Sequence, residues 1–106
     1  MSSRFDKLSA LLAVDPGDPF VLYGLAQEHA KVGTAEHHAQ AVGFYDRCIA
    51  ADAAYLYAYY HKGMSLIALE RTDEAAATLR AGLSAANRAG DQKAIGELGS
   101  LLDQIT

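Results

Sequence analysis

Two segments of the chain repeat one spacing of apolar and small residues. A shift of 37 residues pairs Ala26 with Gly63, and a shift of 34 residues pairs Cys48 with Gly82 in the part that follows. The shorter second shift implies an insertion of three residues in the first segment, which we place within residues 34–39. A single repeat of this length cannot bury its apolar face alone, so the two copies are expected to stack.

Apolar residues in and around these segments recur at a spacing of three or four, which is typical of amphipathic helices. The sequence contains no strand-like alternation, and the turns between the helical patterns are short. Consecutive helices with short connections pack antiparallel. The sequence therefore predicts an all-α fold of about six helices arranged as antiparallel hairpins.

Residues with strong end preferences separate these helices. Pro16 disfavours the helical region for the residue before it and so ends the first helix. Asp18 can cap a second helix whose first residue is Pro19, where no N–H is needed. Gly33 suits the end of that helix because it adopts a left-handed backbone without steric cost. Thr72, which two acidic residues follow, is predicted to cap the fifth helix.

Composition and charge disfavour several classes of partner. The chain of 106 residues has a net charge of −4, and its nine Lys and Arg residues are scattered, so we expect no nucleic acid and no membrane partner. Cys48 is the only cysteine, which rules out an intramolecular disulfide and fits a reducing compartment. Since neither a signal peptide nor a long apolar span is evident, a cytoplasmic location is expected.

The order of residues in the two segments resembles the tetratricopeptide repeat. The shared pattern is large-x-x-Leu-small-x-x-aromatic, then Gly, then Ala-x-x-x-aromatic-x-x-small-apolar, then Asp-Pro. It covers about residues 19–87 as two repeats, and the "DPGDPF" opening is similar to small bacterial two-repeat proteins. The second repeat departs more, with Lys62 for leucine, Glu70 for glycine and Ala53 for proline, while His29 replaces an aromatic residue in the first.

This resemblance implies a short right-handed superhelix. As one domain over 1–106, the chain would divide into a half-repeat helix at 1–14, a first repeat at 19–53, a second repeat at 54–88 and a capping helix at 91–105. Small residues would let the helix backbones approach where the two helices of a hairpin cross. These positions are Ala26, Ala41, Cys48, Gly63, Ala75 and Gly82.

The resemblance also implies a binding face and a function. In family members that bind peptides, the concave face is formed by the first helix of each pair, and we expect a protein-interaction module or adaptor that binds an apolar or amphipathic peptide there. The matching positions are Phe20, Tyr23, Gln27, Lys31, Tyr57, Tyr60, His61 and Met64. The lysine and asparagine clamp that grips a chaperone carboxylate in one branch is absent, since only Lys31 is basic.

Other functions receive less support from the sequence. The main alternative is a structural protein that forms a homodimer through the same residues or through its end helices. We expect no enzyme activity and no cofactor, because no nucleophile, phosphate-binding or paired-acid motif appears, and Cys48 is expected to be buried and inert. A metal site at His37 and His38 is not expected either, because adjacent residues of a helix point about 100° apart and neither has a recognisable spacing to His29 or His61.

Overall fold

The computed structural model describes residues 3–106, and all regular structure in that range is helical. The sequence prediction of an all-α fold with about six helices is therefore confirmed. The six helices are α1 (Arg4–Val14), α2 (Pro19–Val32), α3 (Ala35–Ala51), α4 (Leu56–Ala68), α5 (Thr72–Ala89) and α6 (Gln92–Ile105). None of the helices in the described range is long and apolar enough to cross a membrane.

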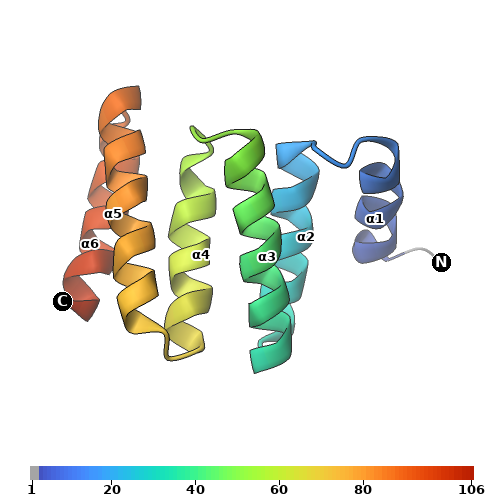
Figure 1. Cartoon of the computed structure of the whole chain (residues 1–106), viewed down its shortest axis with the longest axis horizontal. Helices are drawn as coiled ribbons and strands as arrows, with labels where there is room; N and C mark the ends of the chain where they lie inside the picture. Colours follow the sequence, from blue (N-terminus) through green and yellow to red (C-terminus); the bar gives the residue numbers. More distant parts are fainter. Residues whose placement is uncertain (1–2) are drawn as a thin grey trace.

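The helices form an elongated stack in chain order, which measures 42 × 29 × 19 Å. Helices α2 and α3 form one antiparallel hairpin, α4 and α5 form the next, and in Figure 1 α6 lies behind α5. Helix α1 packs mainly on α2 and lies apart from α3 in Figure 1. Helix α4 also contacts both α2 and α6, so these alternate helices share one side of the stack.

The core is built around the small residues of the repeat. Ala26, Ala41, Cys48 and Ala75 are completely buried, as the sequence predicts. A Cβ atom at Gly82 would lie only 2.7 Å from Tyr59 Cβ, closer than two carbon atoms can approach. The two helices of the second hairpin therefore meet at a distance that only glycine permits.

The inserted residues of the first repeat form helix rather than loop. In α3, Ala41 is preceded by six helical residues, whereas its counterpart Ala75 in α5 is preceded by three. The insertion thus adds most of one turn to the start of α3, and this turn carries His37 and His38. Both histidines are partly buried, His37 against His29 of α2 and His38 against Ser65 of α4.

Most helix ends agree with the predicted signals. The Asp18 carboxylate accepts hydrogen bonds from the N–H groups of Phe20 and Val21, at 3.0 and 3.4 Å, and Gly33 has a left-handed backbone (φ 83°). The prediction for Thr72 was wrong. Thr72 is the first residue of α5, and its side chain caps nothing because Arg71 takes the capping position and pairs with the Glu74 carboxylate instead.

Candidate functional site

The four candidate residues of the first repeat lie around a single pocket. Phe20, Tyr23, Gln27 and Lys31 follow one another at three- and four-residue spacing, so they share one face of α2. The pocket has a volume of about 370 Å³, and it is also lined by Glu28 of α2 and by Arg4 of α1. The predicted face is thus a real concavity in its first half, and Arg4 is a member that sequence reasoning missed.

The tyrosine of this pocket connects the two repeats. The Tyr23 ring contacts Tyr55, with 4.9 Å between centroids, and meets His61 of α4 edge-on at 5.9 Å. Burial of the Tyr23 phenol, together with the neighbouring Tyr55, raises its pKa to about 12. The hydroxyl therefore stays protonated at neutral pH and can donate a hydrogen bond.

Polar groups at the pocket are already engaged within the chain. The Tyr45 hydroxyl donates to Gln27 Oε1, which uses one acceptor position of that oxygen and leaves the amide N–H₂ of Gln27 for a ligand. Lys31 Nζ lies 2.9 Å from one carboxylate oxygen of Glu28, and Arg4 Nε lies 3.6 Å from the other. Because Glu28 offsets part of the positive charge, the pocket is a weak site for a carboxylate, in agreement with the missing clamp.

The candidates of the second repeat form an aromatic cluster on α4. Tyr60 meets His61 edge-on at 5.2 Å between centroids and Tyr57 at 6.4 Å. Tyr60 also packs against the core formed with α6, so part of this ring is structural. Met64, one turn further along α4, is 47% exposed and leaves an apolar side chain free at the surface.

Helix α6 adds a charge to this cluster that the sequence pattern did not predict. Burial lowers the pKa of His61, and the nearby Glu97 carboxylate partly opposes that shift. Desolvation followed by the charge of Glu97 raises the pKa of Tyr57. Helix α6 therefore borders the second half of the candidate face, and His61 is mainly neutral at neutral pH.

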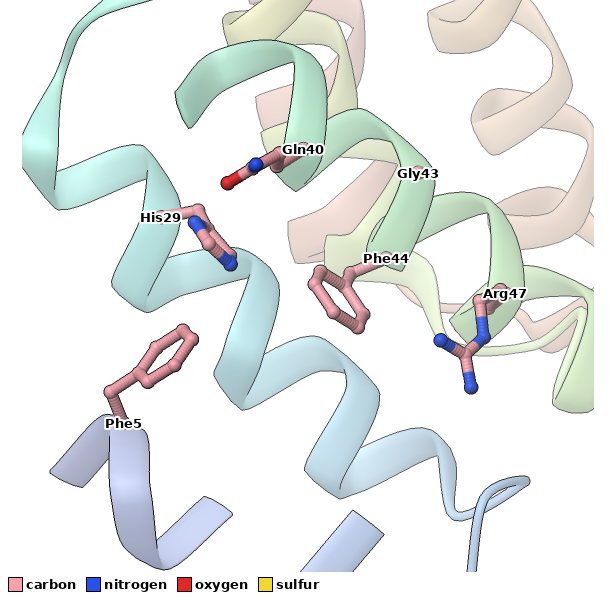
Figure 2. A pocket seen from close by; sticks show the side chains of 6 residues that line it. All are labelled: Phe5, His29, Gln40, Gly43, Phe44 and Arg47. Carbon is pink, nitrogen blue, oxygen red and sulfur yellow. The ribbon is translucent and has the colours of Figure 1, made fainter. Parts of the chain in front are cut away.

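A second cavity lies on the other side of α2, and the sequence analysis did not predict it. Figure 2 shows Phe5 of α1 and His29 of α2 facing Phe44 of α3 across this space. Its volume is about 480 Å³, and the Arg47 guanidinium lies 5.5 Å from the centre of the Phe44 ring. The cavity exists because α1 and α3 both pack on α2 without closing on each other. A periodic pattern contains no information about that gap.

Cys48 is buried at the crossing of the first hairpin, as expected. Burial, followed by the charge of Asp52, raises the pKa of its thiol to about 11. A thiol that stays protonated and inaccessible is a poor nucleophile. Among residues 3–106, no group of three or more histidine, cysteine and carboxylate side chains converges on one point.

Comparison with solved structures identifies the family. The chain is similar to a tetratricopeptide repeat domain protein from Salinibacter ruber, whose solution NMR structure matches with a TM-score of 0.75 at 35% sequence identity, over 86% of this chain and 89% of that one. A crystal structure with the same description and source matches with a TM-score of 0.72 at 35% identity, over 83% of this chain and 94% of that one. No family model and no curated protein sequence matches. The chain belongs to the tetratricopeptide repeat family, and the resemblance seen in its sequence is confirmed.

Proposed function

We propose that this protein binds an apolar or amphipathic peptide segment across α2 and α4. The family supports a general role as a protein–protein interaction module, and the specific surface is our inference. The proposed binding face is the set predicted from the sequence, with Arg4 added to its rim. It consists of Arg4, Phe20, Tyr23, Gln27, Lys31, Tyr57, Tyr60, His61 and Met64.

The observation that carries the proposal is the continuity of this face. Phe20 is 64% exposed at one end, and Met64 is 47% exposed at the other. Between them, the contact of Tyr23 with His61 leaves no break between the two repeats. A pocket beside Phe20 and a polarisable methionine at the far end suit a partner that buries apolar side chains at both points.

The charges around the face favour an apolar partner over an acidic tail. Lys31 and Arg4 are partly neutralised by Glu28, while Glu97 borders the aromatic cluster. An acidic tail bound there would be repelled by the Glu97 carboxylate, and no unpaired cation would compensate for that repulsion. A helix with one apolar stripe meets no such repulsion.

The test is selection of short binding peptides from a displayed random library, followed by measurement of affinity with variants. Phe20→Ser combined with Met64→Ser should lower the affinity of the selected peptides at least tenfold. Thermal stability should change little, because both side chains are largely exposed. Val14→Ser is the matched control, since Val14 is 84% exposed on α1 and lies outside the proposed face. Peptides that bind the double variant as tightly as the native chain would refute this assignment.

Truncation of Tyr60 would not separate binding from stability. Because the ring packs against the second core, Tyr60→Ala should cost about 2 kcal/mol of stability in addition to any loss of binding. Exposed residues are therefore the better probes of this face.

Self-association is the second candidate function. Helix α1 exposes Leu11 to 53% and Val14 to 84%, and the partly exposed Phe5 lies on the same helix. Light scattering over a hundredfold range of concentration distinguishes the two candidates. Our proposal expects a monomer throughout, whereas a dimer that Leu11→Ser dissociates would favour self-association through α1. A cytoplasmic location stays a prediction from the sequence.

A further inference from the structure

The cavity between α1 and α3 lies outside the proposed binding face, and no residue of that face lines it. Phe5 of α1 and Phe44 of α3 form its walls, and His29 of α2 lies between them (Figure 2). Its volume of about 480 Å³ is within the range of small-molecule sites, and an apolar cavity of about 150 Å³ already holds benzene. The space is therefore sufficient for a ligand with more than one ring.

The equivalent place between α3 and α5 is closed. A shift of 37 residues relates α1 to α3 and α2 to α4, and a shift of 34 residues relates α3 to α5. These shifts put three smaller or aliphatic residues in the places of the Phe5, His29 and Phe44 rings, namely Val42, Leu66 and Thr78. All three are buried, whereas Phe5 is 41% exposed. The packing of a repeat thus requires neither an open cavity nor aromatic walls at this place, and both are particular to the first hairpin.

The rings around the cavity are arranged to contact another aromatic group. The His29 ring is nearly parallel to that of Phe44, with 12° between planes and 5.5 Å between centroids, and it meets Phe5 edge-on at 5.2 Å. Aromatic pairs favour these two arrangements, so a planar ring that enters between Phe5 and Phe44 finds both kinds of contact. Burial and the nearby His37 lower the pKa of His29, so this ring is neutral at neutral pH.

Arg47 supplies a positive charge at the cavity. Its guanidinium lies 5.5 Å from the centre of the Phe44 ring, and one of its N–H groups donates to the Pro16 carbonyl at 3.2 Å. Among residues 3–106, Arg47 makes no ion pair, and the adjacent Asp46 carboxylate pairs with Lys62 instead. A guanidinium has five N–H donors, and two of them match the oxygens of a carboxylate. The cavity therefore combines an aromatic lining with a cation that lacks a partner carboxylate.

We propose that this cavity binds a small aromatic carboxylic acid. The ring system lies between Phe5 and Phe44, and the carboxylate pairs with Arg47. Gln40 lies one turn before Phe44 on α3, and Arg47 lies nearly one turn after it, so the two polar groups are at opposite ends of the Phe44 ring. The Gln40 amide can bond to a polar substituent on the far side of the ligand. An aromatic amine is disfavoured, because its charge would be repelled by Arg47.

The experiment is a titration of the full chain with 2-naphthoate, followed by NMR of the amide and aromatic resonances. The native chain should bind one equivalent saturably, with a dissociation constant of about 0.1–1 mM. The largest shifts are expected at Phe5, Gly43 and Phe44. 2-Naphthamide has the same rings without the charge and should bind at least about threefold more weakly. Arg47→Gln should remove this difference between the acid and the amide.

A second variant fills the cavity without altering the core. No atom lies within 4 Å of a Cβ added at Gly43, which lines the cavity, so the side chain of Gly43→Leu has room at the opening. This variant should lower the affinity for 2-naphthoate at least tenfold. Gly96→Leu is the matched control, because its Cβ also meets open space and it lies on α6, outside the cavity. Its affinity should stay within about twofold of the native value, and circular dichroism checks that both variants are folded.

Four results would overturn the proposal. One is the absence of saturable binding at about 5 mM 2-naphthoate in a chain that is folded by NMR. Equal affinities of the native chain for the acid and the amide would remove the role of Arg47, and an unchanged affinity in Gly43→Leu would place the ligand elsewhere. The fourth is tighter binding of the peptide acetyl-Gly-Phe, whose C-terminal residue carries the same two groups, because the ligand would then be a peptide end rather than a free acid.

Discussion

The two hairpins share their packing positions but differ in how their helices begin and end. In the first, Asp18 and Thr34 accept backbone hydrogen bonds at the starts of α2 and α3, and Gly33 occupies the left-handed position between them. In the second, neither Tyr55 nor Arg71 makes a side-chain capping bond. The comparison shows that this repeat tolerates poor helix ends when the helix crossing is retained.

The linker of the second hairpin has glutamate in the left-handed position that glycine occupies in the first. Glu70 has a left-handed backbone (φ 60°), and it is the only non-glycine residue with positive φ in the described part of the chain. The N–H groups of Glu70 and Arg71 donate to the carbonyls of Ile67 and Leu66, both at 2.9 Å, so the turn geometry is the one that glycine normally adopts. The hydrogen bonds are retained, and the strain is carried by the glutamate.

The contact with the preceding helix differs as well. Leu25 of the first repeat packs in an apolar cluster with Leu8 of α1. At the equivalent place, Lys62 extends its ammonium group to Asp46 of α3, with 2.6 Å between nitrogen and oxygen. The departure from the family pattern at Lys62 therefore has a partner on the neighbouring helix.

The largest effect is expected at the crossing of the second hairpin. Gly82→Ala would place a methyl group 2.7 Å from Tyr59 Cβ, an atom attached to backbone that cannot turn away. We expect a loss of about 2 kcal/mol in the free energy of unfolding, because overpacking strain exceeds the gain in helix propensity. Urea unfolding of the variant and of the native chain measures this loss. Gly99→Ala is the control, since nothing lies within 4 Å of its new methyl group and it should stabilise the chain.

A smaller effect is expected at the start of the first hairpin. Asp18→Ala removes the acceptor for two backbone N–H groups of α2 and should cost about 1 kcal/mol. Asp18→Asn keeps an acceptor oxygen and should recover most of that stability. If both variants unfold at the same urea concentration as the native chain, the difference in capping between the hairpins does not contribute to the free energy of unfolding.

A substitution in the linker of the second hairpin should instead raise the stability of the chain. Glu70→Gly relieves the left-handed strain and should stabilise the chain by about 0.5–1 kcal/mol. Gly33→Ala, at the equivalent place in the first hairpin, should destabilise it by a similar amount. Thermal unfolding of both variants tests whether the two linkers have equivalent backbones, and a destabilised Glu70→Gly would contradict that.

The smallest effect concerns pH. Burial lowers the pKa of His61 from its ordinary value of 6.5, with Glu97 of α6 opposing the shift. The unfolded chain therefore binds a proton more readily at this position, and the stability that neutral His61 provides is complete above about pH 6.5 and is lost as the pH falls below it. The stability difference between the native chain and His61→Gln should shrink between about pH 7 and pH 5. A constant difference over that range would mean that His61 titrates normally.

Periodicity was sufficient to predict the helices, because an amphipathic helix depends on local spacing, whereas the family was predicted from the resemblance of the residue order to a known repeat. Ala26, Ala41 and Ala75 are buried as predicted, and the Asp18–Pro19 start agrees with the observed boundary. The prediction that Thr72 caps α5 was wrong, because a hydroxyl residue followed by acids does not reveal whether the neighbouring Arg71 takes the capping position. The candidate face was predicted residue by residue, but Gln27 turned out to be bonded to Tyr45 across the hairpin.

The sequence alone determined the helices, their order and the repeat, since these follow from a helical period of about 3.6 residues and from the residues that favour helix ends. Tertiary structure alone decided which side chains from different helices meet. Arg4 in the first pocket, Glu97 beside His61 and the contact of His29 with His37 all depend on the angle and distance between packed helices. That distance is set by the side chains at each crossing, and no pattern along a single helix contains it.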